Sequence, residues 1–511
     1  MDAHTAHLAA VAGALGVGVL MLGRGRWMLL AGLALLVAAE AGLVASLSGG
    51  IGLGSVSAAA ATGGALAAAA LLAGAAALFV RWPVATIPAL LVTAPFRLPI
   101  DFDSSHQFLI AAAEPGQLGR LLPLYFVLTA AALALAWRLL RGAEARPLPL
   151  LLALPAGLFL GFAAISLTWT DDLEAARQLL EFFLLPFAGL VAVIGRSPFG
   201  ESLPRVLAIC ALALASLFAA IGIYQGITQE LLFFAPNLEL SNENTEYFRV
   251  TSLFGDPSLY GRHVVLGLAV LIVLLAMRKA SPAWGIPLAC FLAAGLLFSY
   301  SQSSMTALVA VTLAVLAVTG GRGTRLAVGG ILVAGVLVLA GVGASAAVRG
   351  DSLREATSDR SRRVEDTTRV IADHPIVGVG LGAQPRASQD RSDRDEPTPS
   401  FVSHTTPLTI AAELGAVGLA LYLALLVCGV LLLGAVRRRA PALGLALAAV
   451  FLALFVHALF YSGFVEDPIT WVVLAVGAAY LSASGAVNAQ GRLGGKRPRA
   501  TEAAETAPTT R

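Results

Sequence analysis

The chain has 511 residues, of which 58% are hydrophobic and only 13% are charged, and its mean hydropathy is +0.82. Soluble domains carry about 25% charged residues, so this composition excludes a water-soluble protein and indicates an all-α, polytopic membrane protein. The net charge of +3 gives no support for nucleic-acid binding. Cys210, Cys290 and Cys428 lie far apart in apolar runs, without CxxC spacing, and are expected to be packing residues.

Apolar runs divide the chain into candidate membrane spans. Runs of roughly 17–25 residues are long enough to cross a hydrocarbon core about 30 Å thick. We expect a transmembrane helical bundle of about 12–15 spans, in which 83–95 is the weakest candidate because it is short and contains three prolines. The candidates are 6–22, 27–47, 57–80, 83–95, 121–137, 148–169, 178–194, 204–226, 258–277, 284–300, 304–319, 325–345, 406–433, 442–463 and 467–486.

Lysine and arginine placement predicts the orientation of these spans. The N-terminus lacks the basic region of a cleavable signal and is predicted to lie outside, ahead of a first membrane helix. Basic residues cluster in alternate short loops, which the positive-inside rule makes cytoplasmic. The loops left outside are 48–56, 96–120, 170–177, 227–257, 301–303, 346–405 and 464–466.

One external loop is rich in arginine. Residues 349–404 carry nine arginines, matched by ten aspartates and glutamates. Loops near this length escape the positive-inside rule more easily, so we expect the arginines to serve a purpose outside. From Ser352 to Asp373 this loop lacks glycine and proline and has helix-like apolar spacing, which predicts a surface helix that ends at Asp373-His374-Pro375.

The predicted organisation has five parts. They are N-terminal transmembrane helices at 1–245, central transmembrane helices at 246–345, the extracytoplasmic loop at 346–405, C-terminal transmembrane helices at 406–486 and a disordered cytoplasmic tail at 487–511. Gly378, Gly380 and Gly382 form a G-V-G-L-G strip in the loop, where the backbone could approach a ligand or a neighbouring helix. The strip lacks the strand–turn–helix context of a dinucleotide site, so we reject nucleotide binding there.

Four segments carry recognisable patterns. HPIVGVGLG (374–382) is followed by a polar stretch and then by SHTTPLTIAAELGAVGLALYL (403–423), which places His404 at the mouth of a membrane helix. Upstream lie RVTSLFGDPSLYG (249–261) and SYSQSSMTAL (299–308). From spacing alone, His404 is an exposed loop histidine or a helix cap.

The order of these segments resembles the O-antigen ligase and O-antigen polymerase superfamily. The resemblance implies a multi-pass protein of the inner (plasma) membrane that moves an oligo- or polysaccharide from an undecaprenyl-pyrophosphate carrier to a glycan, lipid or protein acceptor. It places the active site on the extracytoplasmic face and implies no cofactor. Thr405 stands where the family has asparagine, and Ser304 stands where it has arginine.

The resemblance also implies roles for particular residues. Such a transfer needs a base with a pKa near the operating pH, as histidine has, and cations that bind pyrophosphate bidentately, as arginine does. His404 is therefore the candidate base. Arg249, Arg262 and Arg360 are the candidate pyrophosphate-binding residues, with a salt bridge as the alternative for the first and an interfacial position as that for the second. Ser303 lies at a tight external turn, where it caps a helix or contacts sugar.

Other ionisable residues in the apolar segments have weaker assignments. Glu413 lies in an apolar run, and its burial implies a partner such as an arginine. His263 is expected to be a core or cavity residue, and His374 to shape a turn. His457, Glu466 and Asp467, near the last external turn, have no assigned role.

Metal binding and transport are the remaining alternatives. The two D-x-D strings, Asp101/Asp103 and Asp393/Asp395, resemble metal-binding pairs, but such spacing is common by chance in charged loops, so we expect no metal site. A flippase is disfavoured because the halves show no internal repeat. Ligase and polymerase use the same leaving group, so both stay open.

Overall fold

The computed structural model describes residues 2–47, 58–96, 121–232, 236–349, 360–391, 402–403, 405–461 and 463–494. Within these ranges every regular element is a helix, which confirms the predicted all-α fold. Eleven helices in this part of the chain are long and apolar enough to cross a membrane, and three shorter apolar helices accompany them. Together with α14 (Arg322–Arg349), these helices occupy all of the predicted spans.

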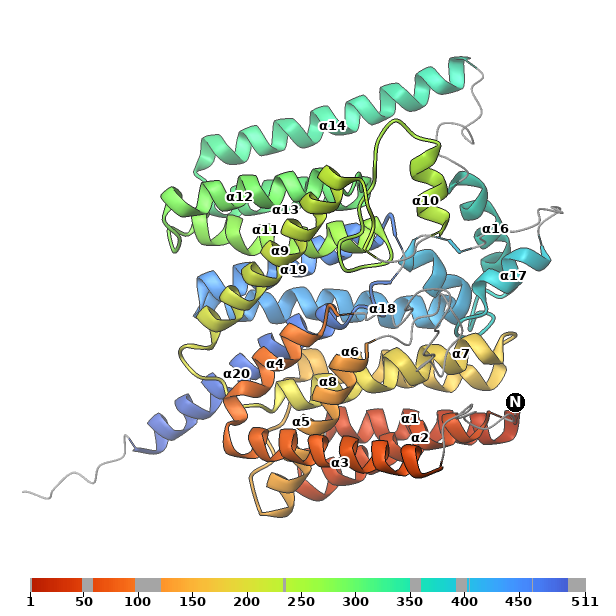
Figure 1. Ribbon diagram of the computed structural model, residues 1–511, viewed down its shortest axis with the longest axis vertical. Coiled ribbons are helices and arrows are strands. Elements are labelled where there is room, and N and C mark those ends of the chain that lie inside the picture. The colour runs from red at the N-terminus through yellow and green to blue at the C-terminus, as the bar shows by residue number, and fades with distance from the viewer. Residues whose placement is uncertain are drawn as a thin grey trace, which may run out of the picture.

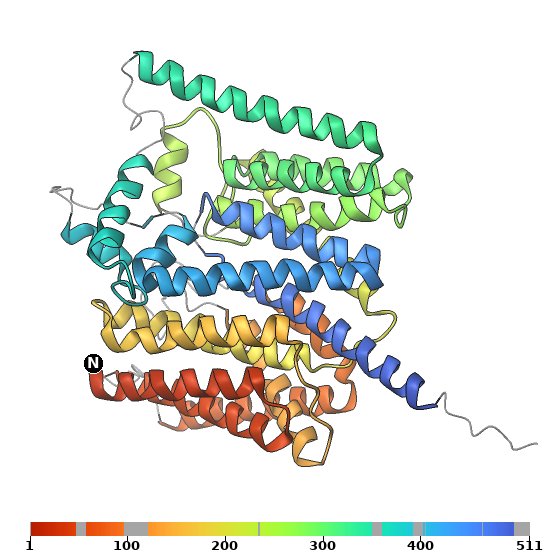
Figure 2. The same cartoon turned by 180° about the vertical axis from the view of Figure 1, so that it is seen from behind.

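The helices are stacked side by side in one bundle, with α14 outermost at one edge (Figures 1 and 2). In chain order they are α1 (Ala3–Leu22), α2 (Arg26–Ala45), α3 (Ala58–Arg81), η1 (Pro83–Ala85), α4 (Thr86–Thr93), α5 (Leu122–Leu140), α6 (Leu150–Ile165), η2 (Ser166–Trp169), α7 (Leu173–Leu179), η3 (Leu180–Leu184), α8 (Leu185–Gly195), α9 (Leu203–Thr228), α10 (Pro236–Glu243), α11 (Pro257–Ala276), α12 (Pro282–Leu297), α13 (Gln302–Thr319), α14 (Arg322–Arg349), α16 (Arg360–Asp373), α17 (Gln384–Asp390), α18 (Thr406–Arg439), α19 (Pro441–Ala458) and α20 (Pro468–Gly494).

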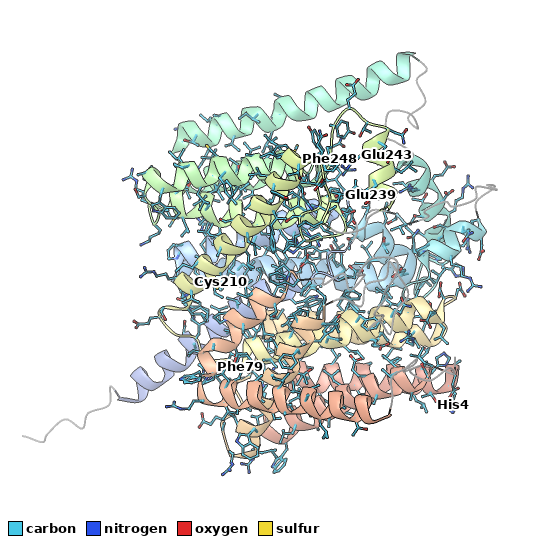
Figure 3. All side chains as sticks on the ribbon, viewed as in Figure 1. His4, Phe79, Cys210, Glu239, Glu243 and Phe248 are labelled. Carbon is cyan, nitrogen blue, oxygen red and sulfur yellow. The ribbon has the colours of Figure 1, made fainter. Side chains whose placement is uncertain are left out.

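The two ends of the bundle differ in character. The N-terminus and the short helices α10, α16 and α17 lie at one end, which we call the loop end, and the last turns of α20 lie at the other (Figure 1). His4, Glu239 and Glu243 lie toward the loop end, whereas Cys210 lies toward the opposite end (Figure 3). Because α1 starts at the loop end, its basic junction with α2 falls at the opposite end, which we call the basic end.

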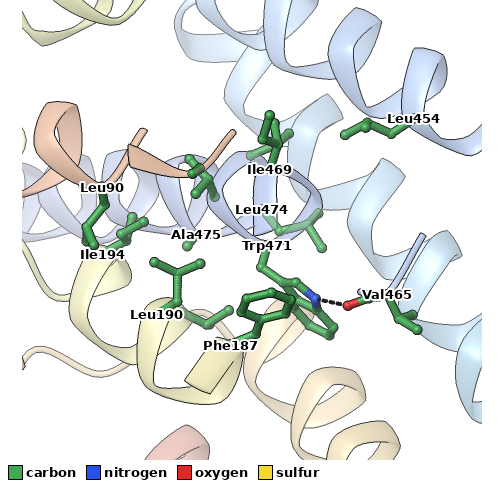
Figure 4. Close-up of a cluster of buried hydrophobic side chains, with 14 of the residues drawn as sticks. Leu90, Phe187, Leu190, Ile194, Leu454, Val465, Ile469, Trp471, Leu474 and Ala475 are labelled. Carbon is green, nitrogen blue, oxygen red and sulfur yellow. Dashed lines mark hydrogen bonds between the residues drawn. The ribbon is translucent and has the colours of Figure 1, made fainter. Parts of the chain in front are cut away.

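A buried aromatic cluster holds the centre of the bundle together. Trp471, near the start of α20, is fully buried, and its indole Nε1 donates a 2.8 Å hydrogen bond to the carbonyl of Val465. Phe187 and Leu190 of α8 lie beside it (Figure 4). A buried indole needs such an acceptor, and this one fixes the turn before α20.

The surface helix of the long loop exists and ends where it was predicted to end. α16 ends at Asp373 and packs against α17 and α18. Its buried face contains Asp366, Thr367 and Val370, whereas Val364 is exposed. The first part of the predicted helix, 352–359, lies outside the described residues.

Two boundaries differ from the expected ones. The predicted external loop 170–177 is helical from Leu173, because Asp172 accepts a hydrogen bond from the Ala175 N–H and caps α7. Arg177, only 2% exposed, pairs with Glu174 and Glu181 one turn away on either side.

At the other end of the chain, α20 continues to Gly494, past the start of the predicted tail, since no proline interrupts it. Residues 495–511 lie outside the described part.

The three cysteines are free thiols. Cys210 and Cys428 are partly buried, whereas Cys290 is exposed on α12. The packing role expected of all three therefore does not extend to Cys290.

Candidate functional site

The structure breaks α18 at Gly415, inside the ELG sequence. Gly415 has φ 62° and ψ −164°, so the helix ladder is interrupted there. The N–H groups of Ala416 and Val417 consequently turn outward from the ladder. They donate to the carbonyls of Pro375 and Ile376, at 2.8 and 3.2 Å.

The carbonyls freed by the same break are also used. Ala412 accepts from the N–H of Val379 at 3.0 Å, and Glu413 accepts from the N–H of Gly380 at 2.8 Å. Backbone polar groups at membrane depth must be satisfied within the protein, and here HPIVGVGLG satisfies those of the broken helix. The two sequence motifs are thus two halves of one backbone hydrogen-bonded unit.

The glycine strip makes this contact possible. Gly378, Gly380 and Gly382 all have positive φ values, of 69°, 93° and 75°. A Cβ on Gly380 would lie 2.3 Å from the Cα of Thr170, just before α7. The sequence predicted that the backbone of this strip approaches either a ligand or a neighbouring helix. The structure shows close approach to neighbouring helices.

The RVTSLFGDP segment is held by one buried glutamine. Gln225 of α9 accepts through Oε1 from the N–H groups of Thr251 and Ser252, at 3.2 and 2.6 Å. Its Nε2 donates to the carbonyl of Ser252 at 3.3 Å. Asp256 then caps α11, accepting from the Ser258 N–H at 2.6 Å. The loop is therefore fixed at both ends.

At the start of this loop, both backbone polar groups of Arg249 are hydrogen-bonded. The side chain of Asn242 accepts from the Arg249 N–H and donates to its carbonyl, each at 3.0 Å. The guanidinium Nε of Arg249 is buried without a hydrogen-bond partner among the described residues. In that part of the chain no carboxylate forms an ion pair with Arg249, although its segment is acidic.

A serine cluster connects the start of α13 to the start of α11. Ser301, rather than a residue inside α13, is the helix cap, and its Oγ lies 3.1 Å from Ser303 Oγ and 2.9 Å from Ser304 Oγ. Ser304 Oγ in turn donates to the carbonyl of Ser258 at 3.4 Å. A Cβ on Gly261 would lie 2.7 Å from Ser304 Oγ, so α11 and α13 touch here. Ser303 is buried in this cluster.

Arg262 faces the interior of the bundle. It is 3% exposed, and its guanidinium nitrogen lies 2.8 Å from a carboxylate oxygen of Asp467, which is 1% exposed. The alternative of an interfacial arginine is thereby excluded. Its partner, Asp467, had no role in the sequence analysis because the two residues are far apart in the chain.

His457 is a further buried residue of this region that sequence reasoning missed. It is fully buried near the end of α19, and its Nε2 lies 3.2 Å from the carbonyl of Ser258. Because a carbonyl only accepts, Nε2 carries the proton. Nδ1 is buried without a partner in the described part of the chain. The one available signal was a histidine inside an apolar run.

His404, the candidate base, lies outside the described residues. Its neighbours are described and fixed. The N–H of Ser403 donates to Gln384 Oε1 at 3.2 Å, and Ser403 Oγ lies 2.5 Å from Thr409 Oγ1. On the other side, Thr405 Oγ1 donates to the carbonyl of Leu459, at the end of α19, at 3.3 Å.

The remaining sequence candidates are placed as follows. Arg360 is the first residue of α16, and its side chain is not among those described. Asp101, Asp103, Asp393 and Asp395 lie outside the described ranges. Within those ranges, no group of three or more histidine, cysteine, aspartate or glutamate side chains has the arrangement to hold a metal ion.

Glu413 does not pair with an arginine in the described part of the chain, contrary to expectation. Its carboxylate is buried and faces the backbone N–H groups of Gly382 and Gln384. Together with Glu466 it lines a cavity of about 30 Å³ at the break in α18. The groups that face this carboxylate are thus backbone amides in and just after the glycine strip.

The two other histidines of this region, His263 and His374, each contact neighbouring side chains or backbone. His263 stacks on Phe254 with ring centroids 4.5 Å apart, and its Nδ1 donates to the carbonyl of Leu259 at 2.7 Å. His374 lies at the turn after α16, where Arg391 contacts its Nε2 at 3.2 Å. Arg391 also pairs with Asp373, and this hydrogen bond lowers the pKa of the Asp373 carboxyl.

Residues 287–423 match the family model described as O-antigen ligase. The chain carries an O-antigen ligase domain. The match begins in α12 and ends in α18, so this domain includes the serine cluster, α16, the glycine strip and the break at Gly415. Over this range the match supports the resemblance to the O-antigen ligase and polymerase superfamily. Among curated proteins, none matches the chain.

Proposed function

We propose that this protein transfers an oligo- or polysaccharide from an undecaprenyl-pyrophosphate carrier to an acceptor, as an O-antigen ligase does. The observation that carries this proposal is the O-antigen ligase domain at residues 287–423. The geometry supports it, because the domain's serine cluster at the start of α13 meets the α11 start that follows Arg249. A repeat-unit polymerase is the alternative within the same superfamily.

In the proposed reaction an acceptor hydroxyl attacks the anomeric carbon of the donor sugar. The bond from that carbon to the pyrophosphate oxygen breaks, and the pyrophosphate leaves on its lipid. His404 takes the proton of the hydroxyl, a role that suits the histidine side chain in general. The anchored neighbours Ser403 and Thr405 support this role, since they fix the backbone on both sides of the histidine.

Arginines stabilise the leaving pyrophosphate in this proposal. Arg249 is the leading candidate, because its backbone is clamped while its Nε has no partner in the described structure. Arg360, at the start of α16, is a second binding residue, and Ser303 is a sugar contact. Arg262 carries a charge already balanced by Asp467, so we propose that it acts at the base of the site. Arginine guanidinium groups can stabilise the charge of the leaving pyrophosphate by bidentate hydrogen bonds, so the proposed transfer needs no metal ion.

We further propose that the loop end faces the extracytoplasmic side of the inner membrane. The basic junctions lie at the other end of the bundle, and the positive-inside rule makes that end cytoplasmic. The partners would then be the lipid-linked donor and an acceptor on the outer side, with no nucleic acid. The domain organisation proposed from the sequence fits this arrangement, because the 346–405 segment contributes α16 and α17 to the loop end.

The test is the glycolipid profile of a deletion strain. Loss of a ligase leaves long polymers bound to the carrier, displayed on the outer side. Loss of a polymerase leaves single repeat units on the carrier. Loss of a flippase leaves the carrier-linked glycan inside, and that result would contradict the proposed transferase.

A further inference from the structure

An elongated apolar cavity of about 640 Å³ lies under α9. Its walls come from α4, α9, α11, α19 and α20, and α9 runs obliquely in front of α11 and α19 (Figure 1). Along α11 it runs from His263 to Leu274, which is about 16 Å of helix. Ile209 and Trp284 line it and are 56% and 47% exposed, so the cavity opens on the lateral face of the bundle.

The rim of this cavity is charged at the basic end. Arg205, in the first turn of α9, and Lys279, just after α11, both line the cavity and are exposed. Neither forms an ion pair with a described carboxylate, including Glu201 four residues before Arg205. Trp284 lies at the same rim, in the first turn of α12. Tryptophan and basic residues together are typical of the level of lipid headgroups.

We propose that this cavity is a binding site for an anionic glycerophospholipid of the leaflet at the basic end. Its phosphate lies between Arg205 and Lys279, and its acyl chains lie along the apolar walls of α9, α11, α19 and α20. The size fits partial burial of the acyl chains, because the cavity of about 640 Å³ lies within the range of about 300–1,000 Å³ that is typical of small-molecule pockets. The charges fit, because each basic residue near a membrane surface favours an anionic headgroup.

A phospholipid explains the cavity better than the isoprenoid chain of the carrier does. The two rim cations lie at the end remote from Arg249, where the carrier pyrophosphate is proposed to bind. At the cavity's other end the lining contains His263, whose Nδ1 is engaged by the Leu259 carbonyl, and no arginine or lysine among its described residues. The positive charges that could bind an anionic headgroup therefore lie at the basic end of the cavity, among its described lining residues.

Trp284 is a native probe for occupancy. The full-length protein is reconstituted in vesicles containing brominated phosphatidylglycerol or brominated phosphatidylcholine, each over the same series of mole fractions. Fluorescence quenching at Trp284 is obtained as the difference between the natural protein and Trp284→Phe. We expect half-maximal quenching at a mole fraction of the anionic lipid at least about tenfold lower than that of the zwitterionic lipid.

The variant Arg205→Gln/Lys279→Gln should lose this preference. The matched control Arg322→Gln/Arg325→Gln, which removes two cations at the start of α14, should keep it. Equal quenching by both lipids, or a preference retained without Arg205 and Lys279, would overturn the proposal. Displacement of the quencher by polyprenyl phosphate but not by unbrominated phosphatidylglycerol would assign the cavity to the carrier instead. The measurement does not depend on glycan transfer, so its failure leaves the proposed function standing.

Discussion

Arg262 of α11 and Asp467, at the start of α20, form a buried ion pair with a nitrogen–oxygen distance of 2.8 Å. The pair connects two segments that are more than two hundred positions apart in the chain. Asp467 also accepts from the N–H of Ile469 through its other carboxylate oxygen, at 2.8 Å, and so caps α20. One carboxylate thus balances a buried charge and starts a helix.

Removing one partner of this pair should destabilise the protein. Asp467→Asn leaves the Arg262 charge buried and uncompensated, which costs about 3–5 kcal/mol, while the amide oxygen keeps the helix cap. The measurement is the free energy of unfolding in mixed micelles. Arg262→Gln/Asp467→Asn should lose less than Asp467→Asn alone, and Asp390→Asn, an exposed carboxylate, should have no effect. Equal losses in the single and double variants would refute the coupling.

Gly380→Ala should lower stability by at least about 2 kcal/mol. The residue has φ 93°, and a Cβ would lie 2.3 Å from the Thr170 backbone, so the strip would separate from its neighbouring helices. Gly189→Ala is the matched control, since a Cβ there meets nothing within 4 Å. Thermal unfolding of the purified proteins decides this, and a tolerated alanine at Gly380 would contradict the close packing.

His404→Ala should abolish transfer while expression and membrane insertion stay normal. A positioned base contributes roughly 100-fold or more to rate, so transfer from a purified lipid-linked donor should fall at least that far. His374→Ala, which changes another histidine of the same loop, is the control and should retain activity. Full activity in a well-expressed His404→Ala protein would reject this histidine as the base.

Arg249→Lys should be nearly as damaging as Arg249→Ala. A lysine supplies a point charge but not the bidentate fork that binds pyrophosphate, and losing one charge-assisted hydrogen bond costs roughly tenfold or more. The rate of transfer by both variants is compared with that of Arg369→Lys, which changes an exposed arginine paired with Glu365. If Arg249→Lys keeps most of the activity, charge alone suffices.

Transfer should survive chelation of divalent cations. Several arginine hydrogen bonds converging on one pyrophosphate, each worth about 1.5–3 kcal/mol, replace the charge stabilisation of a metal. The assay uses purified protein, lipid-linked donor and excess EDTA. Activity that vanished with EDTA and returned with magnesium or manganese would contradict the arginine mechanism and make Asp101 and Asp103 the first residues to mutate.

The membrane spans and the family were predictable from the sequence for a simple reason. Every span must bury its backbone polar groups in its own helix, so a long apolar run is by itself a sufficient signal. The stop of α16 at Asp373 was likewise local, because proline follows two residues later. The motifs around HPIVGVGLG and ELG gave the superfamily, and residues 287–423 confirm it.

The partners of the site residues were decided by tertiary structure alone. Nothing local joins Arg262 to Asp467, Gln225 to Ser252, or His457 to the Ser258 carbonyl, because each pair comes from helices that meet only in the packed bundle. The sequence by itself determined that α18 contains a glycine at 415. Only the fold decided that the helix breaks there, since the break is stable only where Pro375, Ile376, Val379 and Gly380 supply the hydrogen bonds that the broken ladder loses.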